Sequence, residues 1–179
     1  MAGSLEFIKS TTGTSVSSLS VTDCFSADYD VYKIVGHTAE YLPAVATDVI
    51  DLRIQFIDSV GSVISASEYD TARLTMKAEA AFDNDKQTST TYMYGLMLFG
   101  DYDNAGMVNY VYNPNDSSSY TFMQGQGAGG YNTANNRFRG TKQIGVHKSA
   151  EQITGIHFLS SNVSYNFNVT ISVYGLASN

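Results

Sequence analysis

Apolar and polar residues alternate with a period of two in several separate stretches of this chain. In the stretch DLRIQFI, the apolar residues Leu52, Ile54 and Phe56 alternate with Arg53 and Gln55. The stretches ARLTMKAEA and NVTISVY repeat the same alternation. A period of two places every second side chain on one face of an extended backbone. These stretches therefore predict antiparallel strands with one face buried and the other turned to solvent.

The alternating stretches recur along the whole chain, with turn residues roughly every 8–12 positions, the spacing of sandwiches and barrels. We therefore predict an all-β fold: an antiparallel β-sandwich, jelly-roll-like, with about ten short strands. The segment SEYDTARLTMKAEAAF is the one rival for a helix, and its strict alternation favours a strand. The stretch TYMYGLMLFG is apolar on both faces and predicts a central strand. ITGIHFLS and YNFNVTISVYGL predict a closing hairpin.

We expect a single β-sandwich domain over residues 23–179, preceded by an N-terminal arm over residues 1–22. The arm is rich in Ser and Thr, is nearly uncharged, and contains Leu5, Phe7 and Ile8. Such a segment can add a strand to the edge of a sheet, in its own chain or in a neighbour's. The start, MAGSLEFIKS, lacks the cationic and apolar regions of a signal peptide, so we expect none.

The charge balance excludes some classes of partner. Ten Lys and Arg against 17 Asp and Glu leave a formal charge of −7. Nucleic-acid binding needs a concentrated basic face, and binding to anionic membranes needs basic clusters, so we expect neither. We also expect no membrane insertion, because no apolar run approaches the length of a span. Cys24 is the single cysteine, which excludes an intrachain disulfide and predicts a small buried residue.

No stretch of the chain carries a recognisable catalytic motif. His37, His147 and His157 are the three histidines, and none lies in a G-x-S-x-G nucleophile motif. We expect His37 in a loop and His157 on a strand surface. No spacing of His and Cys suits zinc. We therefore expect no enzyme activity, no cofactor and no metal.

Aspartates and glycines are better explained by turns than by sites. Most aspartates, such as Asp83, Asp85 and Asp116, lie in polar stretches, where Asp bonds its own backbone. DYDNAG resembles the start of an EF-hand loop, but Ala105 and Tyr112 stand where the motif needs ligands. A loose surface cation site at this loop is the alternative. GQGAGG is not followed by a helix that could hold phosphate, so we expect a flexible loop.

Two surface features remain as candidates for binding. One is a Tyr- and Asn-rich region over residues 109–136, where tyrosines with small polar residues are typical of adaptable binding surfaces for a glycan or a protein. Its candidate residues are Tyr110, Tyr112, Asn113, Asn115, Tyr120, Tyr131 and Asn132. The other is a basic strip with Arg137, Arg139, Lys142 and Lys148, which could dock on an acidic neighbour. Ordinary β-surface and a strand edge protected by charge are the alternatives for the two features.

Three motifs give the chain a resemblance to a family of known proteins. They are a YD-x-Y strand, a D-x-LR-x-x-F-like strand and an ending of the form I-x-x-I-x-F-x-x-S-x-N…G-x-x-x-x-YG. The matching residues are Tyr29, Asp30, Tyr32, Asp51, Leu52, Arg53, Phe56, Ile153, Ile156, Phe158, Ser161, Asn162, Tyr174 and Gly175. In these motifs the chain resembles surface structural proteins of bacteriophage virions, frequent in phages of marine bacteria and cyanobacteria. The ending departs from the family pattern at Tyr165 and Asn166, where glycine is common.

The resemblance implies a non-enzymatic β-sandwich on the virion exterior, made in the host cytoplasm. It also implies that DYDVYK is the first core strand. Two functions fit, and we favour the first: a capsid decoration protein anchored to other virion proteins by its N-terminal arm. Its candidate docking residues are Leu5, Phe7, Ile8, Arg137, Arg139 and Lys142. The alternative is a tail-fibre or receptor-binding tip that binds host glycan through the Tyr- and Asn-rich region. A homo-oligomer, such as a trimer, suits both.

Overall fold

The structure is a computed structural model that describes residues 4–42, 49–78, 80–95, 97–99, 105–132, 137–162 and 164–177. Twelve strands and no helix occur within these residues, in two antiparallel sheets, which confirms the predicted β-sandwich. The strands are β1 (Leu5–Val16), β2 (Ser18–Val21), β3 (Val31–Leu42), β4 (Val49–Asp58), β5 (Tyr69–Lys77), β6 (Asp83–Thr90), β7 (Met97–Phe99), β8 (Ala105–Tyr112), β9 (Thr121–Asn132), β10 (Arg137–His147), β11 (Ile153–Ser160) and β12 (Asn166–Leu176). Several are ten to twelve residues long, so the expectation of short strands was wrong.

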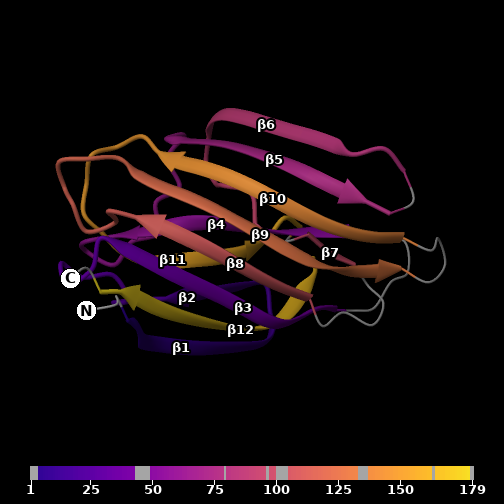
Figure 1. Cartoon of the computed structure of the whole chain (residues 1–179), viewed down its shortest axis with the longest axis horizontal. Helices are drawn as coiled ribbons and strands as arrows, with labels where there is room; N and C mark the ends of the chain where they lie inside the picture. The colour runs from indigo at the N-terminus through magenta and orange to yellow at the C-terminus, as the bar shows by residue number, and fades with distance from the viewer. Residues whose placement is uncertain are drawn as a thin grey trace.

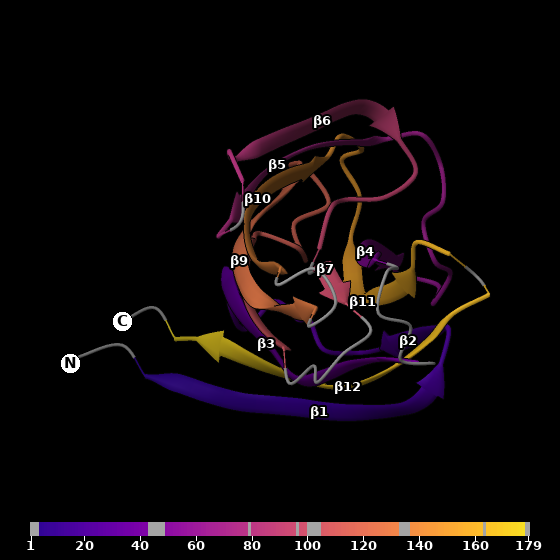
Figure 2. The same ribbon diagram turned by 90° about the vertical axis from the view of Figure 1, so that its right-hand side faces the viewer.

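The two sheets differ in size, and the large sheet curves around the small one. The large sheet has the order β1-β12-β3-β8-β9-β10-β5-β6, and the small sheet has the order β2-β11-β4-β7. The chain crosses between sheets after β1, β2, β3, β4, β6, β7, β10 and β11, which is the connectivity of a jelly roll with extra strands in the large sheet. Figure 1 shows the strands labelled, and in Figure 2 the large sheet curves around the small one.

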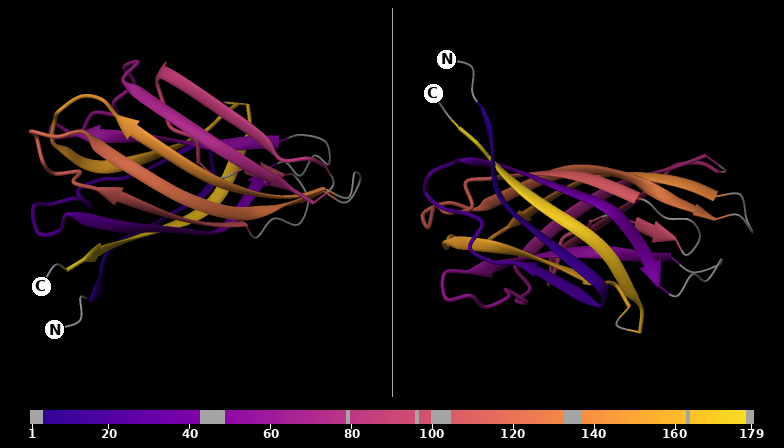
Figure 3. Two further views of the ribbon diagram at one scale, coloured as in Figure 1. Left: turned by 45° about the horizontal axis from the view of Figure 1, so that its top comes forward. Right: turned by 90° about the horizontal axis from the view of Figure 1, so that it is seen from below.

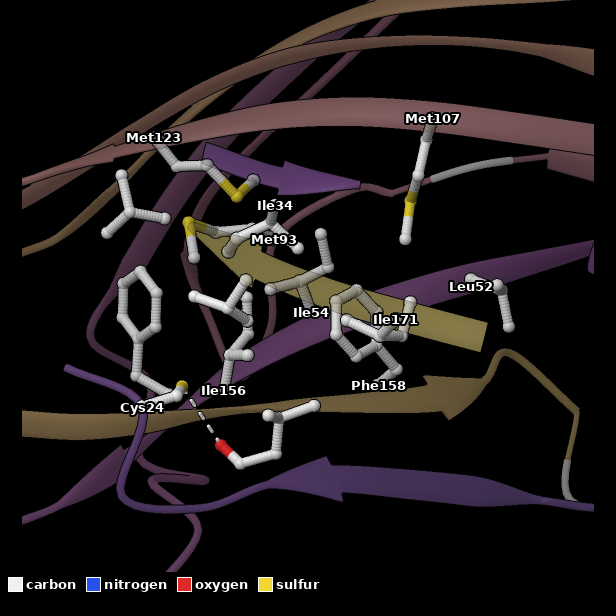
Figure 4. Close-up of a cluster of buried hydrophobic side chains, with 14 of the residues drawn as sticks. Cys24, Ile34, Leu52, Ile54, Met93, Met107, Met123, Ile156, Phe158 and Ile171 are labelled. Carbon is white, nitrogen blue, oxygen red and sulfur yellow. Dashed lines mark hydrogen bonds between the residues drawn. The ribbon is translucent and has the colours of Figure 1, made fainter. Parts of the chain in front are cut away.

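The hydrophobic core fills the space between the sheets. Its members come from alternate positions of β3, β4, β11 and β12, as the sequence pattern predicts. Leu52, Ile54 and Phe56 are fully buried on β4. Figure 4 shows this cluster, with the Sγ of Cys24 donating to the carbonyl oxygen of Val21 at 3.2 Å. Cys24 is therefore the small buried residue that the sequence predicts, and its burial raises the pKa of the thiol to about 12.

The stretch DYDVYK supplies the first residues of an interior strand. β3 lies between β12 and β8, and its side chains Tyr32 and Ile34 are fully buried. The hydroxyl of Tyr32 donates to the carbonyl oxygen of Ser26, 2.8 Å away, and accepts from the amide nitrogen of the same residue. Tyr29 and Asp30 precede the strand. The interpretation of this stretch as a core strand is confirmed.

The N-terminal segment is paired within its own chain. β1 lies antiparallel to β12 at the edge of the large sheet, and β2 pairs with β11 at the edge of the small sheet. Val21, at the end of β2, is fully buried in the core. Figures 2 and 3 show the start of β1 and the end of β12 projecting together beyond the rest of the sheet. An anchoring role for residues 1–22 stays a prediction.

The expected central strand over residues 91–100 is wrong. Of the described residues in this stretch, Met97–Phe99 alone form a strand, β7, and it lies at the edge of the small sheet. Before it, Met93 makes an isolated bridge with Ile54, and Met93 and Tyr94 are buried. A Cβ atom on Gly95 would lie 2.0 Å from the carbonyl oxygen of Leu52. This segment is apolar on both faces because it fills the space beside β4, so its apolar character does not reflect a central strand.

The expected hairpin of the last two strands is also wrong. β11 belongs to the small sheet and pairs with β2 and β4, whereas β12 belongs to the large sheet and pairs with β1 and β3. The connection between them crosses from one sheet to the other. Val169, Ile171 and Val173 do share one buried face of β12, as the alternation predicts.

GQGAGG, expected as a flexible loop, lies in the middle of β9. Gly125 pairs with Asn109 on one side and with Gln143 on the other. The side chains of these two residues meet across the glycine, with Gln143 Nε2 donating to Asn109 Oδ1 at 2.9 Å. A Cβ atom at Gly125 would lie 1.8 Å from that same oxygen. Glycine here provides room for a contact between neighbouring strands, which the local sequence does not reveal.

Two smaller expectations are also corrected. Asp83 and Asp85, assigned to turns, lie in β6, where they pair with Lys77 and Arg73. His37, assigned to a loop, lies in β3 and is exposed. Asp116 does lie in a turn, and the hydrogen bonds that it accepts from Ser118 lower its pKa. The aspartates of DYDNAG, Asp101 and Asp103, lie outside the described residues.

Candidate functional site

The solvent-facing side of the large sheet is the candidate site, and we call it the outer face. Alternation along β8, β9 and β10 places every second side chain on this side. Phe122 and Ile144 are about half exposed there, at 50% and 58%. The residues of the outer face on these three strands are Val108, Tyr110, Tyr112, Phe122, Gln124, Gln126, Ala128, Lys142, Ile144 and Val146. The curvature in Figure 2 makes this face convex.

The register of the strands aligns these side chains in rows across the sheet. Lys33 pairs with Tyr110, which pairs with Gln124, which pairs with Ile144. In the next row, Gln126 pairs with Lys142. Cβ atoms of directly opposite residues lie about 4.5–5.5 Å apart, so side chains in a row contact one another. The outer face is therefore a continuous surface.

A polar trough of about 380 Å³ lies at the centre of the outer face, around Gly125. Two cations, Lys33 and Lys142, lie on its two sides, and Tyr110, Gln124 and Gln126 line it between them. Glutamine amides and a tyrosine offer both hydrogen-bond donors and acceptors next to an aromatic ring. This combination can bind a neutral polar ligand, and the lysines add attraction for acidic groups.

Two apolar troughs flank the polar one. The first, of about 520 Å³, is lined by Phe122, Ile144 and Val146, with Lys86 and Asp70 at its rim. The second, of about 480 Å³, lies over small residues; its lining includes Val35, Gly36, Gly106, Met76 and Ala128. The first shares Gln124 with the polar trough, and the second shares Val108 and Gln126 with it. The three troughs therefore form one surface across β3, β8, β9, β10 and β5.

The predicted Tyr- and Asn-rich loop is a hairpin rather than a loop. Tyr110 and Tyr112 lie on β8, Asn113 and Asn115 follow in the turn, and Tyr120 precedes β9. Tyr131 and Asn132 lie at the opposite end of β9, about 35 Å from its start at 3.4 Å per residue. The structure therefore separates them from the others. Their side chains and residues 133–136 lie outside the described part of the chain.

The predicted docking residues are not brought together either. Leu5 and Phe7 are exposed on β1, at 46% and 62%, while Ile8 is partly buried against the core. Arg139 and Lys142 lie on β10, five strands away, which is about 24 Å at 4.8 Å per strand. Arg137 begins β10, and its side chain lies outside the described residues. Lys142 alone lies in the candidate site.

Sequence reasoning missed Lys33, Phe122, Gln124, Gln126 and Ile144. A signal was present, because Phe122, Gln124 and Gln126 alternate in the stretch TFMQGQG. Its glycines suggested a loop and concealed the strand. Glycine disfavours strands on average, since it has no side chain to pack.

The remaining candidates for chemistry lie away from the outer face. His157 is half-buried on β11 of the small sheet; burial lowers its pKa, and its Nδ1 lies 2.8 Å from Ser20 Oγ. His147 is fully buried and lies beside Glu68 and Glu151, the one group of potential metal ligands within the described residues. The described residues contain no helix that could cross a membrane.

Comparison with known protein families finds no match, and no curated protein matches the sequence. Solved structures give distant similarities. One is the CBM2 module of the evolved Dit of Lactobacillus casei BL23 phage J-1, with TM-score 0.29 and 9% identity over 90% of this chain and 70% of that chain. Another is a fructofuranosidase of Schwanniomyces occidentalis, with TM-score 0.32 and 10% identity over 98% of this chain. The match spans 34% of the fructofuranosidase chain. TM-scores this low support no conclusion about function.

Proposed function

We propose that this protein is a non-enzymatic protein of a bacteriophage virion exterior, and that its outer face docks onto a neighbouring virion subunit as a decoration protein does. The observation that carries the proposal is the run of exposed apolar side chains across the outer face. The resemblance of the sequence to virion surface proteins also supports a place on the exterior of a virion.

The amount of exposed apolar surface favours a protein partner. Leu74, Met76, Phe122 and Ile144 are each between 38% and 58% exposed on neighbouring strands β5, β9 and β10. Soluble monomers rarely gather large apolar side chains in this way, and such patches mark protein contacts. Aromatic residues and Met are enriched in the centres of protein interfaces.

Charge specifies the kind of partner. The chain carries a net charge of −7, yet Lys33, Lys86 and Lys142 line the troughs of the outer face. These lysines would repel a basic surface and attract an acidic one. The partner is therefore a subunit that presents an apolar patch with carboxylates around it.

The experiment is to measure binding of purified protein to particles that lack it. The test variant is F122E with I144E, which places two charges in the apolar trough. The control is Val60→Glu, which adds charge at an exposed turn where Val60 is 82% exposed. We expect the double variant to bind at least tenfold more weakly, on the order of a lost interface hot spot, with unchanged melting. Particle binding equal to that of the control variant would refute the docking face.

The polar trough favours a second function, binding of a host-surface glycan. Gln124 and Gln126 present amides beside Tyr110, and Gln124 Nε2 donates to the hydroxyl of Tyr112. Sugar rings are bound by such aromatic and amide groups, and a homo-oligomer such as a trimer would multiply a weak site. Replacing Gln124 and Gln126 by Ala should abolish glycan-array binding. No binding of any glycan by the wild-type protein would exclude this second function.

A further inference from the structure

Three potential metal ligands meet where the chain crosses between the sheets. Glu68 ends the crossing from β4 to β5, His147 is the last residue of β10, and Glu151 lies in the crossing from β10 to β11. One ligand atom from each residue lies within 4.8 Å of the other two. The outer face contributes none of them. This cluster is therefore separate from the proposed docking site.

The imidazole of His147 is held in a fixed orientation. Its side chain is fully buried, with the ring of Tyr69 at 4.9 Å and the ring of Phe56 at 6.2 Å between centroids. Tyr69 is fixed in turn, since its hydroxyl donates to the carbonyl oxygen of Ile64 and accepts from the amide of Phe56. His147 Nδ1 has no hydrogen-bond partner among the described residues. Its Nε2 is directed at the two glutamates.

The distances within the cluster are also those expected between ligands of a shared ion. His147 Nε2 lies 3.3 Å from Glu68 Oε2 and 3.6 Å from Glu151 Oε1. Charge-assisted N–H···O bonds are typically about 2.7–2.9 Å long. Around a tetrahedral zinc ion, with ligands at about 2.0–2.2 Å, neighbouring ligand atoms lie about 3.3–3.6 Å apart. The two distances therefore match the edges of a zinc tetrahedron.

The charges of the cluster also point to a cation. Within the described residues, neither Glu68 nor Glu151 forms an ion pair with Lys or Arg. Lys148, next to His147, pairs with Asp70 at 2.8 Å instead. Metal ligation requires ionised carboxylates and a neutral imidazole, and such a ligand set carries a charge of −2, which a divalent ion would balance. The carboxylates are 41% and 34% exposed, so an ion can enter from solvent and keep water as its remaining ligands.

We propose that Glu68, His147 and Glu151 bind one divalent first-row metal ion, of which Zn²⁺ is the best fit to one nitrogen and two oxygen ligands. The ion joins the crossing before β5 to the crossing before β11. Because the unfolded chain lacks this arrangement, binding stabilises the folded state.

The experiment uses the full chain after treatment with EDTA and removal of the chelator. Zn²⁺ is titrated in by calorimetry, melting is followed with and without Zn²⁺, and Co²⁺ absorption reports the coordination geometry. We expect one ion per chain, a higher melting temperature with Zn²⁺, and the intense visible bands of tetrahedral Co²⁺.

The variants are Glu68→Gln and Glu151→Gln, with Glu6→Gln, an exposed glutamate on β1, as the matched control. Both glutamates of the site are partly exposed, so their replacement leaves the fold intact. Each variant should weaken Zn²⁺ binding by about 100-fold or more, since loss of even a supporting group costs 10–100-fold. His147→Gln should abolish the Co²⁺ bands.

Two outcomes would overturn the proposal. One is the absence of saturable binding of Zn²⁺ to the wild-type chain. The other is equal binding by wild type, Glu68→Gln and Glu151→Gln, which would place the ion on other surface carboxylates. In either case His147 is a core histidine that hydrogen-bonds a glutamate, and the proposed docking function is unaffected.

Discussion

The buried side of the large sheet differs between its two ends. At the β12 and β3 end, the inward side chains are apolar: Phe167, Val169, Ile171, Val173, Tyr32 and Ile34. At the β10 and β5 end, most are polar yet equally buried: Thr141, Gln143, His147, Thr71, Arg73 and Thr75. We call these the apolar half and the polar half. The same sheet thus buries two kinds of surface.

What covers each half explains the difference. The large sheet has twice as many strands as the small sheet, so regular strands cannot cover all of it. Around Arg73 and Thr71, residues 91–95 complete the cover in an irregular conformation. The backbone N–H and C=O groups of such a segment need hydrogen bonds from side chains, because the segment lacks the regular hydrogen bonds between paired strands. Thr71 provides one, since its Oγ1 accepts from the amide of Tyr94 at 3.1 Å.

Arg73 is the centre of the polar half. Its guanidinium donates to Asp51 at 2.7 Å and to Asp85 at 3.0 Å, and it stacks 4.4 Å from the ring centroid of Tyr94. Burial alone would lower the pKa of Arg73, but Asp51 and Asp85 raise it above its usual value. The side chain is therefore a paired, charged link between β5, β6 and β4.

The largest effect is expected in the apolar half. Phe167→Ala removes a fully buried ring from the core and should lower the free energy of unfolding by about 3–5 kcal/mol. Phe122→Ala, on the outer face, removes the same ring from a half-exposed position and should cost about 1 kcal/mol or less. Urea denaturation measures both. Equal costs would mean that the core does not lie where the alternation places it.

The next effect is in the polar half. Arg73→Met leaves Asp51 without its cation and should lower the free energy of unfolding by about 2–3 kcal/mol. Breaking a fully buried ion pair costs about 3–5 kcal/mol, and the cost is smaller here because Asp51 is partly exposed. Adding Asp51→Asn should recover part of the loss, as a double-mutant cycle would show. No recovery would mean that Arg73 acts through packing on Tyr94.

A matched pair of threonines tests the hydrogen bonding of the polar half. Thr71 Oγ1 donates to the carbonyl oxygen of Ile144 and accepts from Tyr94, whereas Thr141 Oγ1 has no partner among the described residues. Thr71→Val should cost about 1–2 kcal/mol. Thr141→Val should be neutral or stabilising by up to about 1 kcal/mol. A similar cost for both would indicate an ordered water at Thr141, which a crystal structure would reveal.

The smallest effect is expected outside the polar half, at the partly exposed pair of Asp70 and Lys148. The hydrogen bonds from the Lys148 side chain and the Ser89 amide hold the pKa of Asp70 below its ordinary value of 3.8. The pair therefore contributes stability above about pH 4, which is lost as pH falls through the lower folded-state pKa. Asp70→Asn should weaken this loss of stability on acidification, measured by denaturation from pH 7 to pH 2. High salt should reduce the difference in acid-induced loss of stability between the wild type and Asp70→Asn. If salt leaves this difference unchanged, an ionic origin is excluded.

The strands themselves were predictable because alternation is local. β3, β4, β5, β11 and β12 were all expected as strands, and the inward residues of β4 and β12 were identified correctly. On β5 the apolar Leu74 and Met76 face solvent, whereas the polar Arg73 and Thr75 are buried. A strand of this type requires only that every second side chain reaches the core. The candidate site was predicted only in part: Tyr110, Tyr112 and Lys142 were expected, but Gln124, Gln126 and Ile144 were not. Gly125 concealed their strand, since its packing role depends on Asn109 and Gln143 from two other strands.

By itself, the sequence determined the all-β class, the buried faces of its clearest strands and the burial of Cys24. Only the tertiary structure decided that β11 and β12 enter different sheets, that residues 91–95 fill the core, and that Gly125 of β9 makes room for a contact between Asn109 and Gln143. It also decided that Glu68 meets His147 from 79 residues away. The physical reason is one of range: side-chain direction follows from neighbours along the chain, whereas sheet membership and shared sites follow from contacts between distant segments.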